Sequence, residues 1–152
     1  MLFRSKDTFL PLVIEALKAW KPGNPLDPET TVGALVDTQQ MNTVLSYIQS
    51  GHNEGAKLVA GGKQILQETG GTYVEPTIFD GVSNAMKIAQ EEIFGPVLSV
   101  ISFDTAAEAI QIANDTPYGL AAAVWTADIS KAHLTAKALR AVSACCVCCA
   151  MA

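Results

Sequence analysis

All four cysteines of the chain lie near its end, as Cys145, Cys146, Cys148 and Cys149. Thiols at this spacing could bind zinc or another soft metal, although structural zinc sites usually separate two ligand pairs by a longer loop that lets the tetrahedron close. A disulfide framework would distribute its cysteines along the chain. Two interpretations follow: a metal-binding module that uses these thiols, or a tail foreign to the native sequence. We adopt the second and treat residues 1–5 and 142–152 as non-native ends.

Two adjacent carboxylates, Glu91 and Glu92, precede Phe94 and a Gly-Pro turn. A carboxylate can accept hydrogen bonds from two neighbouring hydroxyls, and an aromatic ring offers a flat apolar surface. On spacing alone, the simpler interpretations prevail: Glu92 is a solvated loop carboxylate and Phe94 is a core aromatic.

The two histidines have no second ligand at metal spacing, because His52 lies in a polar turn and His133 on a predicted helix. We interpret both as structural. Asp37 stands before an apolar periodic segment and is interpreted as a helix cap rather than a catalyst. These residues therefore offer no metal site and no catalytic residue.

Composition limits the classes of function. The chain has 152 residues, of which 49% are hydrophobic and 16% are charged, and its net charge is −5. These values predict one folded domain with no linker and argue against nucleic-acid binding, which needs clustered Lys and Arg. No apolar stretch approaches the roughly 20 residues of a membrane span, and the first residues do not resemble a secretory signal. The predicted location is cytoplasmic, without membrane contact.

Apolar periodicity predicts a helix over residues 6–20, provided that Pro11 lies in its first turn. Residues 21–28 hold three prolines and must form a loop. A second helix is predicted after Asp37, ending near Gly51 and Gly55. Thr105 and Asp128 are predicted to cap two further helices, the last of which reaches Arg140.

Strands are predicted between these helices. Residues 57–60 indicate a short strand, residues 73–79 an extended segment and residues 86–89 a further strand. The runs 97–103 and 120–125 are almost wholly apolar and indicate strands buried on both faces. Strands that alternate with helices predict an α/β fold with crossover connections.

Six motifs in consistent order and spacing carry a family resemblance. They are PGNPLD (22–27), GALVD (33–37), EGAKL with a following Gly-Gly (54–62), PTIF (76–79), EEIFGPV (91–97) and NDTPYGLAAAVWT (114–126). Together they resemble the aldehyde dehydrogenase superfamily over residues 6–141.

The resemblance implies an α/β fold, an incomplete mostly parallel sheet with flanking helices, as part of the aldehyde dehydrogenase catalytic domain. It implies oxidation of an aldehyde to a carboxylic acid with NAD or NADP as cofactor. Glu92 matches the glutamate that binds the nicotinamide ribose hydroxyls, and Phe94 matches the aromatic residue beside the nicotinamide ring. The family's nucleophilic cysteine, glutamate base and oxyanion-hole asparagine lie upstream of the matched motifs, so this chain alone is expected to be inactive.

The resemblance also implies a homo-oligomeric parent enzyme that acts on a small aldehyde. The amino-acid sequence around the motifs is most similar to that of enzymes for ω-amino, γ-glutamylamino or guanidino aldehydes of polyamine and arginine breakdown. The family's core strand after residue 141 is expected to be missing, which would leave an unpaired sheet edge. The alternative is a stand-alone nucleotide-binding or regulatory module without catalysis.

Overall fold

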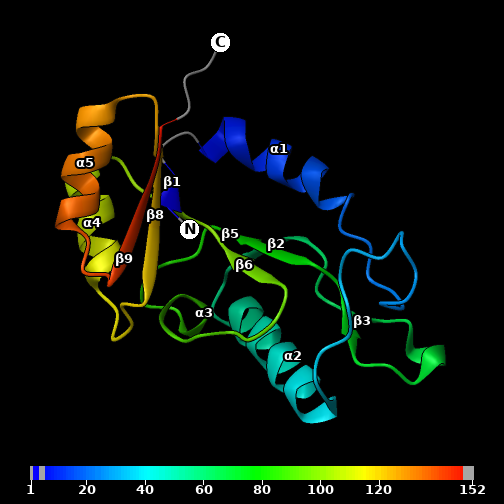
Figure 1. Ribbon diagram of the computed structural model, residues 1–152. Helices are drawn as coiled ribbons and strands as arrows, with labels where there is room; N and C mark the ends of the chain where they lie inside the picture. Colours follow the sequence, from blue (N-terminus) through cyan, green and yellow to red (C-terminus); the bar gives the residue numbers. More distant parts are fainter. Residues whose placement is uncertain (1, 4–5, 149–152) are drawn as a thin grey trace. The chain divides into compact units, whose positions relative to one another are not determined.

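A computed structural model describes residues 2–3 and 6–148 (Figure 1). The contacts within it define two compact units, one spanning Phe3–Ser102 and the other beginning at Phe103. The sequence contains no linker at this junction, which is why the sequence alone did not indicate the division.

The first unit begins with two helices, α1 (Lys6–Leu17) and α2 (Thr38–Asn53). Helix α1 confirms the predicted helix but ends before Trp20. Pro11 is its sixth residue, so the prediction that this proline lies in the first turn was wrong. The helix tolerates the loss of one backbone hydrogen bond there. No described residue of α1 is buried.

Asp37 caps α2 as predicted. Its carboxylate accepts a hydrogen bond from the backbone N–H of Gln40 at 2.7 Å, which satisfies a donor that the first helical turn leaves open. Gly51 is a helical and buried residue rather than the helix end. Gly55 lies just beyond the helix with φ +91°, a conformation that favours glycine.

Short strands form the rest of the first unit. A three-stranded sheet has the order β2 (Lys57–Ala60), β5 (Thr77–Asp80), β6 (Val97–Ser99), and in Figure 1 it lies between α1 and α2. Strands β2 and β5 are antiparallel, whereas β5 and β6 are parallel. Two smaller pairs are β3 (Gln64–Ile65) with β4 (Tyr73–Val74), antiparallel, and β1 (Leu2–Phe3) with β7 (Ile101–Ser102). A short 3-10 helix covers Gln67–Thr69.

The strand predicted over residues 86–89 is wrong, because this segment forms a one-turn helix, α3 (Lys87–Gln90). The carboxylate of Glu54 accepts a hydrogen bond from the backbone N–H of Lys87 at 2.8 Å. An acceptor outside the segment thus satisfies a donor at the start of the helical turn. Such a long-range partner leaves no local signal in the sequence.

The core of the first unit lies between α2, α3 and the sheet. Phe79 is fully buried, and its neighbours share apolar character and low exposure. The cluster consists of Met41, Val44, Ile48, Ala56, Val74, Phe79, Val82 and Ile88. Burial of this kind contributes about 25 cal/mol per Å² of apolar surface, so these contacts hold α2 and α3 against the sheet.

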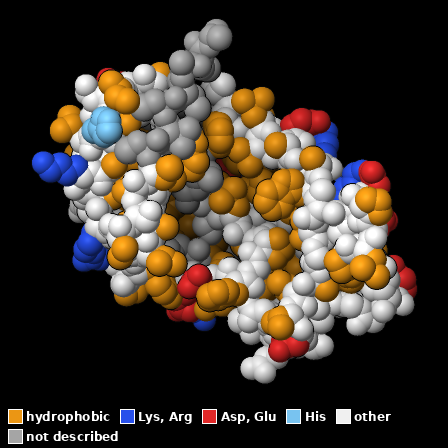
Figure 2. Space-filling view, in the orientation of Figure 1, with side chains coloured by type: hydrophobic (Ala, Val, Ile, Leu, Met, Phe, Trp, Pro, Cys, Tyr) orange, Lys and Arg blue, Asp and Glu red, His pale blue; other side chains and the backbone are white. Residues whose placement is uncertain are grey.

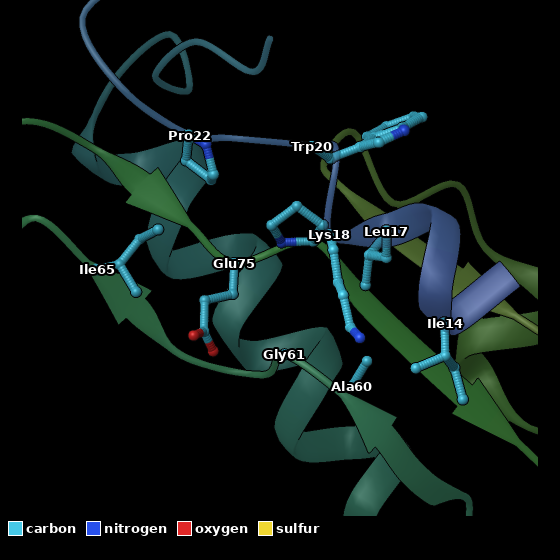
Figure 3. A pocket seen from close by; sticks show the side chains of 10 residues that line it. Ile14, Leu17, Lys18, Trp20, Pro22, Ala60, Gly61, Ile65 and Glu75 are labelled. Atoms are coloured by element: carbon cyan, nitrogen blue, oxygen red, sulfur yellow. The ribbon is translucent and has the colours of Figure 1, made fainter. Parts of the chain in front are cut away.

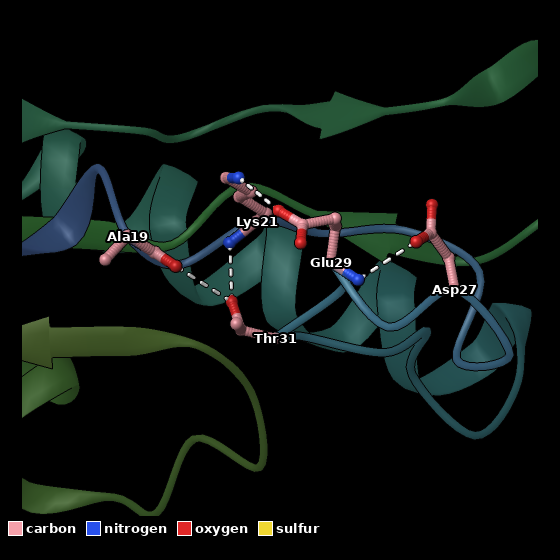
Figure 4. A network of polar contacts seen from close by, with 5 residues as sticks. All are labelled: Ala19, Lys21, Asp27, Glu29 and Thr31. Atoms are coloured by element: carbon pink, nitrogen blue, oxygen red, sulfur yellow. Dashed lines mark hydrogen bonds and ion pairs between the residues drawn. The ribbon is translucent and has the colours of Figure 1, made fainter.

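The predicted loop after α1 is confirmed and is closed by polar contacts (Figure 4). The hydroxyl of Thr31 accepts from the backbone N–H of Lys21 at 2.7 Å and donates to the carbonyl of Ala19 at 3.1 Å. Lys21 also pairs with Glu29 at 3.1 Å. Together with an isolated parallel β-bridge between Pro22 and Val32, these contacts hold the two ends of the loop side by side.

The second unit contains α4 (Ala106–Asn114), β8 (Ala121–Thr126), α5 (Ile129–Ala138) and β9 (Ser143–Cys148). Thr105 caps α4 in a full capping box, and Asp128 caps α5, as predicted. Strands β8 and β9 pair in parallel with unbroken register. The expectation that the strand after residue 141 is missing is therefore wrong.

Strand β8 was predicted to be buried on both faces, and this prediction was wrong too. Exposure alternates along it, and Trp125 is 62% exposed. The reason is that α4 and α5 lie on one side of the β8–β9 pair (Figure 1).

The other described tryptophan, Trp20 of the first unit, is also exposed at 56%. Hydrophobic side chains occupy much of the face in Figure 2.

Candidate cofactor-binding segment

The predicted cofactor residues lie in the irregular segment between α3 and β6. Glu92 and Phe94 are both exposed, Phe94 by 67%, while Ile93 between them packs against the core cluster. Glu92 has no hydrogen bond or ion pair with any residue that the structure describes. The Glu92 carboxylate and the Phe94 ring therefore lie on either side of the partly buried Ile93 and remain open to a ligand. The interpretation of Phe94 as a core aromatic is wrong.

Gln40 of α2 holds the backbone of this segment. Its side-chain amide Nε2 donates to the carbonyl oxygen of Phe94 at 2.9 Å. One turn further along α2, Val44 lies directly under Gly95: a Cβ at residue 95 would stand 2.5 Å from Val44 Cγ2. The segment passes this close to the helix because residue 95 lacks a side chain.

The first carboxylate of the pair is already engaged. Tyr47 of α2 donates its hydroxyl hydrogen to Glu91 Oε2 at 2.7 Å. Lys87 Nζ lies 3.8 Å from the same carboxylate oxygen and 4.9 Å from the centre of the Tyr47 ring. Of the two adjacent acids, Glu91 is therefore turned onto the helix, and Glu92 is the one left for a ligand.

Glu54 completes the attachment at the C-terminal end of α2. It accepts from the hydroxyl of Ser50 at 2.5 Å and from the backbone N–H of Lys87 at 2.8 Å. The hydrogen bond from Ser50, followed by that from Lys87, lowers the pKa of the Glu54 carboxyl below its ordinary 4.5. The charged form of Glu54 is thus the one that binds α3.

These contacts come from one stripe of α2, which sequence reasoning missed. Its members are spaced four, three, four and three residues apart, so they share one face of the helix. The α2 stripe consists of Gln40, Val44, Tyr47, Gly51 and Glu54. The spacing was visible in the sequence, but its partners lie too far away along the chain for the sequence to indicate them.

The arrangement suits a ligand with adjacent hydroxyls and a flat ring. An ionised carboxylate has two oxygens that each accept a hydrogen bond, and an exposed aromatic side chain supplies an apolar contact. The ribose and nicotinamide of NAD or NADP have these two features. The segment supplies binding and orientation, and no described residue in it forms a nucleophile–base pair.

Other candidate sites gain no support. Among the described side chains, which cover residues 6–145, no group of three or more His, Cys, Asp or Glu could hold a metal ion, and His52 and His133 are exposed. Cys145 is exposed with a free thiol. The side chains of the other three cysteines fall outside the described ones, so the metal-binding interpretation of the tail stays untested. None of the helices in the described part of the chain has the length and apolar character needed to cross a bilayer.

A cavity of about 350 Å³ opens elsewhere in the first unit (Figure 3). Ile14 and Leu17 of α1 and Lys18 just after it line one side, and Ala60 and Glu75 are among the residues that line the other. Neither Glu92 nor Phe94 lines this cavity. The cavity is therefore separate from the candidate cofactor-binding segment.

Comparisons with known proteins place the chain in a family. A model of the aldehyde dehydrogenase family matches residues 4–147. The fluoroacetaldehyde dehydrogenase of Streptantibioticus cattleyicolor is 51% identical over 138 residues, which are 89% of this chain and 27% of the relative. The chain thus spans less than a third of the length of this relative.

Solved structures agree in fold. The P. syringae AldA indole-3-acetaldehyde dehydrogenase, in complex with NAD+ and IAA, superposes with a TM-score of 0.93 at 81% identity, over 95% of this chain and 30% of that one. The aldehyde dehydrogenase KauB from Pseudomonas aeruginosa gives the same TM-score and identity, over 95% and 29%. These matches confirm the predicted fold class, and the chain belongs to the aldehyde dehydrogenase family.

Proposed function

We propose that this chain forms one edge of the nicotinamide-ribose site of an NAD(P)-dependent aldehyde dehydrogenase. Glu92 would accept hydrogen bonds from the two ribose hydroxyls, and Phe94 would lie against the nicotinamide ring. The observation that carries the proposal is the exposure of these two side chains on either side of the partly buried Ile93. The NAD+ bound in the P. syringae relative supports NAD as the cofactor.

The parent enzyme would convert an aldehyde, NAD(P)+ and water to a carboxylic acid, NAD(P)H and a proton. The bound cofactor supplies the acceptor for the hydride that leaves the substrate carbon. The residues of this chain hold and orient: Glu92 fixes the ribose, and Phe94 limits the motion of the ring. Correct placement of two reacting groups can lower a barrier by several kcal/mol, so orientation is a catalytic contribution in its own right.

The finer substrate proposal is an ω-amino, γ-glutamylamino or guanidino aldehyde of polyamine and arginine breakdown, oxidised in the cytoplasm by a homo-oligomer. The support for this substrate class is the amino-acid sequence around the six motifs. The names of the relatives point to other aldehydes, among them indole-3-acetaldehyde, fluoroacetaldehyde and betaine aldehyde. Comparing kcat/KM of the full-length enzyme for an ω-amino aldehyde and for indole-3-acetaldehyde would decide between them. A preference for the indole compound would refute the polyamine assignment.

The central test is Glu92→Gln in a full-length carrier, made by placing residues 6–141 of this chain in the 81% identical P. aeruginosa relative. The change keeps the shape of the side chain but removes its charge and one acceptor. Hydrogen bonds to charged groups contribute ~1.5–3 kcal/mol, so a loss of roughly tenfold or more is expected in the KM for NAD+ or in kcat. The KM for the aldehyde should change much less.

The matched control is Glu68→Gln, the same change at an exposed carboxylate of the 3-10 helix. It should leave both cofactor parameters unchanged. The proposal would be refuted if Glu92→Gln changed neither the KM for NAD+ nor kcat. Glu92 would then be interpreted as a solvated loop carboxylate.

A further inference from the structure

We propose that the cavity beside α1 is a second ligand site, which binds a small primary amine in its ammonium form through Glu75. The inference does not rest on the cofactor-binding segment, because neither Glu92 nor Phe94 lines the cavity. Its support comes from a carboxylate without a partner, from apolar walls and from a backbone that is already fixed where the carboxylate leaves it.

The charged side chains that line the cavity are Lys18 and Glu75, and their charges are not matched to each other. Lys18 Nζ lies 2.5 Å from Glu15 Oε2, so its positive charge is paired with a residue that does not line the cavity. Glu75 is half-buried, and its carboxylate has no hydrogen bond or ion pair with any residue that the structure describes. Figure 3 shows the charged ends of Lys18 and Glu75 apart from each other. The unmatched charge in the cavity is therefore negative.

A cation is the ligand that complements such a carboxylate. A carboxylate that is partly withdrawn from water loses hydration, and nothing among the described residues replaces it. An ammonium group offers three donors and a positive charge, so it restores the hydrogen bonds and the charge balance together. A calcium or magnesium ion would need about six oxygen ligands, and no acidic cluster among the described side chains provides them. The ligand class is therefore an organic cation.

The walls of the cavity favour an apolar body on that cation. Ile14 and Leu17 line it from α1 and Ile65 lines it from β3, and all of these side chains are half-buried. The indole of Trp20 adds a further apolar surface that is 56% exposed. The volume of about 350 Å³ lies at the lower end of the range of about 300–1,000 Å³ for small-molecule sites. A short alkyl chain would thus be buried while its ammonium group meets Glu75.

The backbone around Glu75 is fixed before any ligand arrives. The backbone N–H of Glu75 donates to the carbonyl of Lys63 at 2.9 Å, and the Glu75 carbonyl accepts from the Thr77 hydroxyl at 2.7 Å. Gly61 has φ +69°, and a Cβ there would clash with the carbonyl oxygen of Pro76, so these two backbone segments touch. Binding would therefore require little further ordering of the chain, which favours affinity.

The first test is a calorimetric titration of the full-length carrier with hexylammonium. We expect a dissociation constant of roughly 1 mM or below. The neutral analogue 1-hexanol should bind roughly tenfold or more weakly, because it lacks the charge that Glu75 pairs with, and hexanoate should not bind. Butylammonium tests the apolar walls: each methylene that is lost should weaken binding by roughly three- to fourfold.

Glu75→Gln assigns the binding to the cavity. This change keeps the shape of the side chain and removes its charge, so the affinity for hexylammonium should fall by roughly tenfold or more. The matched control is Glu68→Gln, at an exposed carboxylate that does not line the cavity, and it should bind as the parent does. Amine that binds at the aldehyde site of the carrier contributes equally to all three proteins and cancels in the comparison. If Glu75→Gln does not fold, the series of ligands on the unaltered carrier still decides.

Three results would overturn the proposal. The first is the absence of both binding heat and a rise in melting temperature at about 10 mM hexylammonium. The second is equal affinity of the parent and of a folded Glu75→Gln for hexylammonium. The third is equal binding of hexylammonium and hexanoate, which would show that the cavity takes apolar chains without regard to charge. None of these measurements involves Glu92, so the outcome is independent of the cofactor test.

Discussion

Gly95 and Val44 approach so closely that a Cβ on residue 95 would stand 2.5 Å from one Val44 methyl and 2.9 Å from the other. Val44 is fully buried and β-branched, so it has few other rotamers and no space to move into. This contact joins the α2 stripe to the turn that follows Phe94.

Gly95→Ala is therefore expected to destabilise the protein by ~1–3 kcal/mol, the usual cost of overpacking. The measurement is the shift in thermal melting of the full-length carrier. Gly33→Ala is the control, because a Cβ at Gly33 would meet nothing within 4 Å. Equal melting temperatures for the two variants would contradict the close approach. Adding Val44→Ala to Gly95→Ala should cost less than the sum of the two single changes.

The lowered pKa of Glu54 predicts that the free energy of unfolding decreases as the pH falls into the acid range. Because its folded pKa is lowered, the folded state holds the proton less tightly than the unfolded chain does. The stabilisation is complete above the ordinary pKa of 4.5 and is lost as the pH falls through the lower folded pKa. Glu54→Gln should thus show a smaller loss of stability than the parent between about pH 6 and pH 3, measured by urea unfolding at each pH.

Ser50→Ala serves as the companion variant, because the Ser50 hydroxyl is the largest cause of the lowered pKa of Glu54. It should reduce the acid-side loss of stability only in part, since the backbone N–H of Lys87 still donates. Identical acid-side curves for the parent and Glu54→Gln would show that the proton affinity of Glu54 does not change on folding.

Asn114 links the ends of α4 and α5 in the second unit. Its Nδ2 donates to the carbonyl of Ala138 at 2.9 Å, and its Oδ1 accepts from the backbone N–H of Arg140 at 2.7 Å. Asn114→Ala removes both hydrogen bonds and should destabilise the second unit by about 1–3 kcal/mol, at ~0.5–1.5 kcal/mol for each bond. Hydrogen exchange of the β8 and β9 amides measures the change. Gln111→Ala, at an exposed position of the same helix, should leave the exchange unaltered.

Purified residues 1–152 are expected not to oxidise any aldehyde with NAD+ or NADP+. The resemblance assigns the nucleophile and the general base to segments upstream of the matched motifs, and neither thiol attack nor hydrolysis proceeds without them. The assay follows NADH absorbance in a homogeneous preparation. Activity that a thiol alkylator abolishes would contradict the prediction. Binding of NAD+ without turnover would instead favour the stand-alone nucleotide-binding module.

The sequence was informative wherever the deciding contact is local. Asp37, Thr105 and Asp128 cap their helices through backbone donors three residues away, so residue type and position were sufficient. The placement of Glu92 and Phe94 followed from a motif of seven residues. Local chemistry thus predicted the helix caps, while the assignment of Glu92 and Phe94 to the cofactor stays a prediction from the motif.

Tertiary contacts decided the rest. Residues 86–89 form a helix because Glu54, distant in the chain, supplies the acceptor for Lys87. The pairing of Gln40 with Phe94 spans 54 positions, and that of Tyr47 with Glu91 spans 44. Neither pairing alters the hydrophobic period on which sequence reasoning depends. The partial exposure of β8 likewise reflects which of its faces the helices cover.

The chain has two tryptophans, and each compact unit holds one of them, Trp20 or Trp125, at an exposed position. Indole fluorescence therefore has one source per unit. Trp20→Phe leaves Trp125 as the only emitter, and Trp125→Phe leaves Trp20. Denaturation of these two variants, followed by emission wavelength, would report separately on each unit and reveal whether they melt in one transition or two.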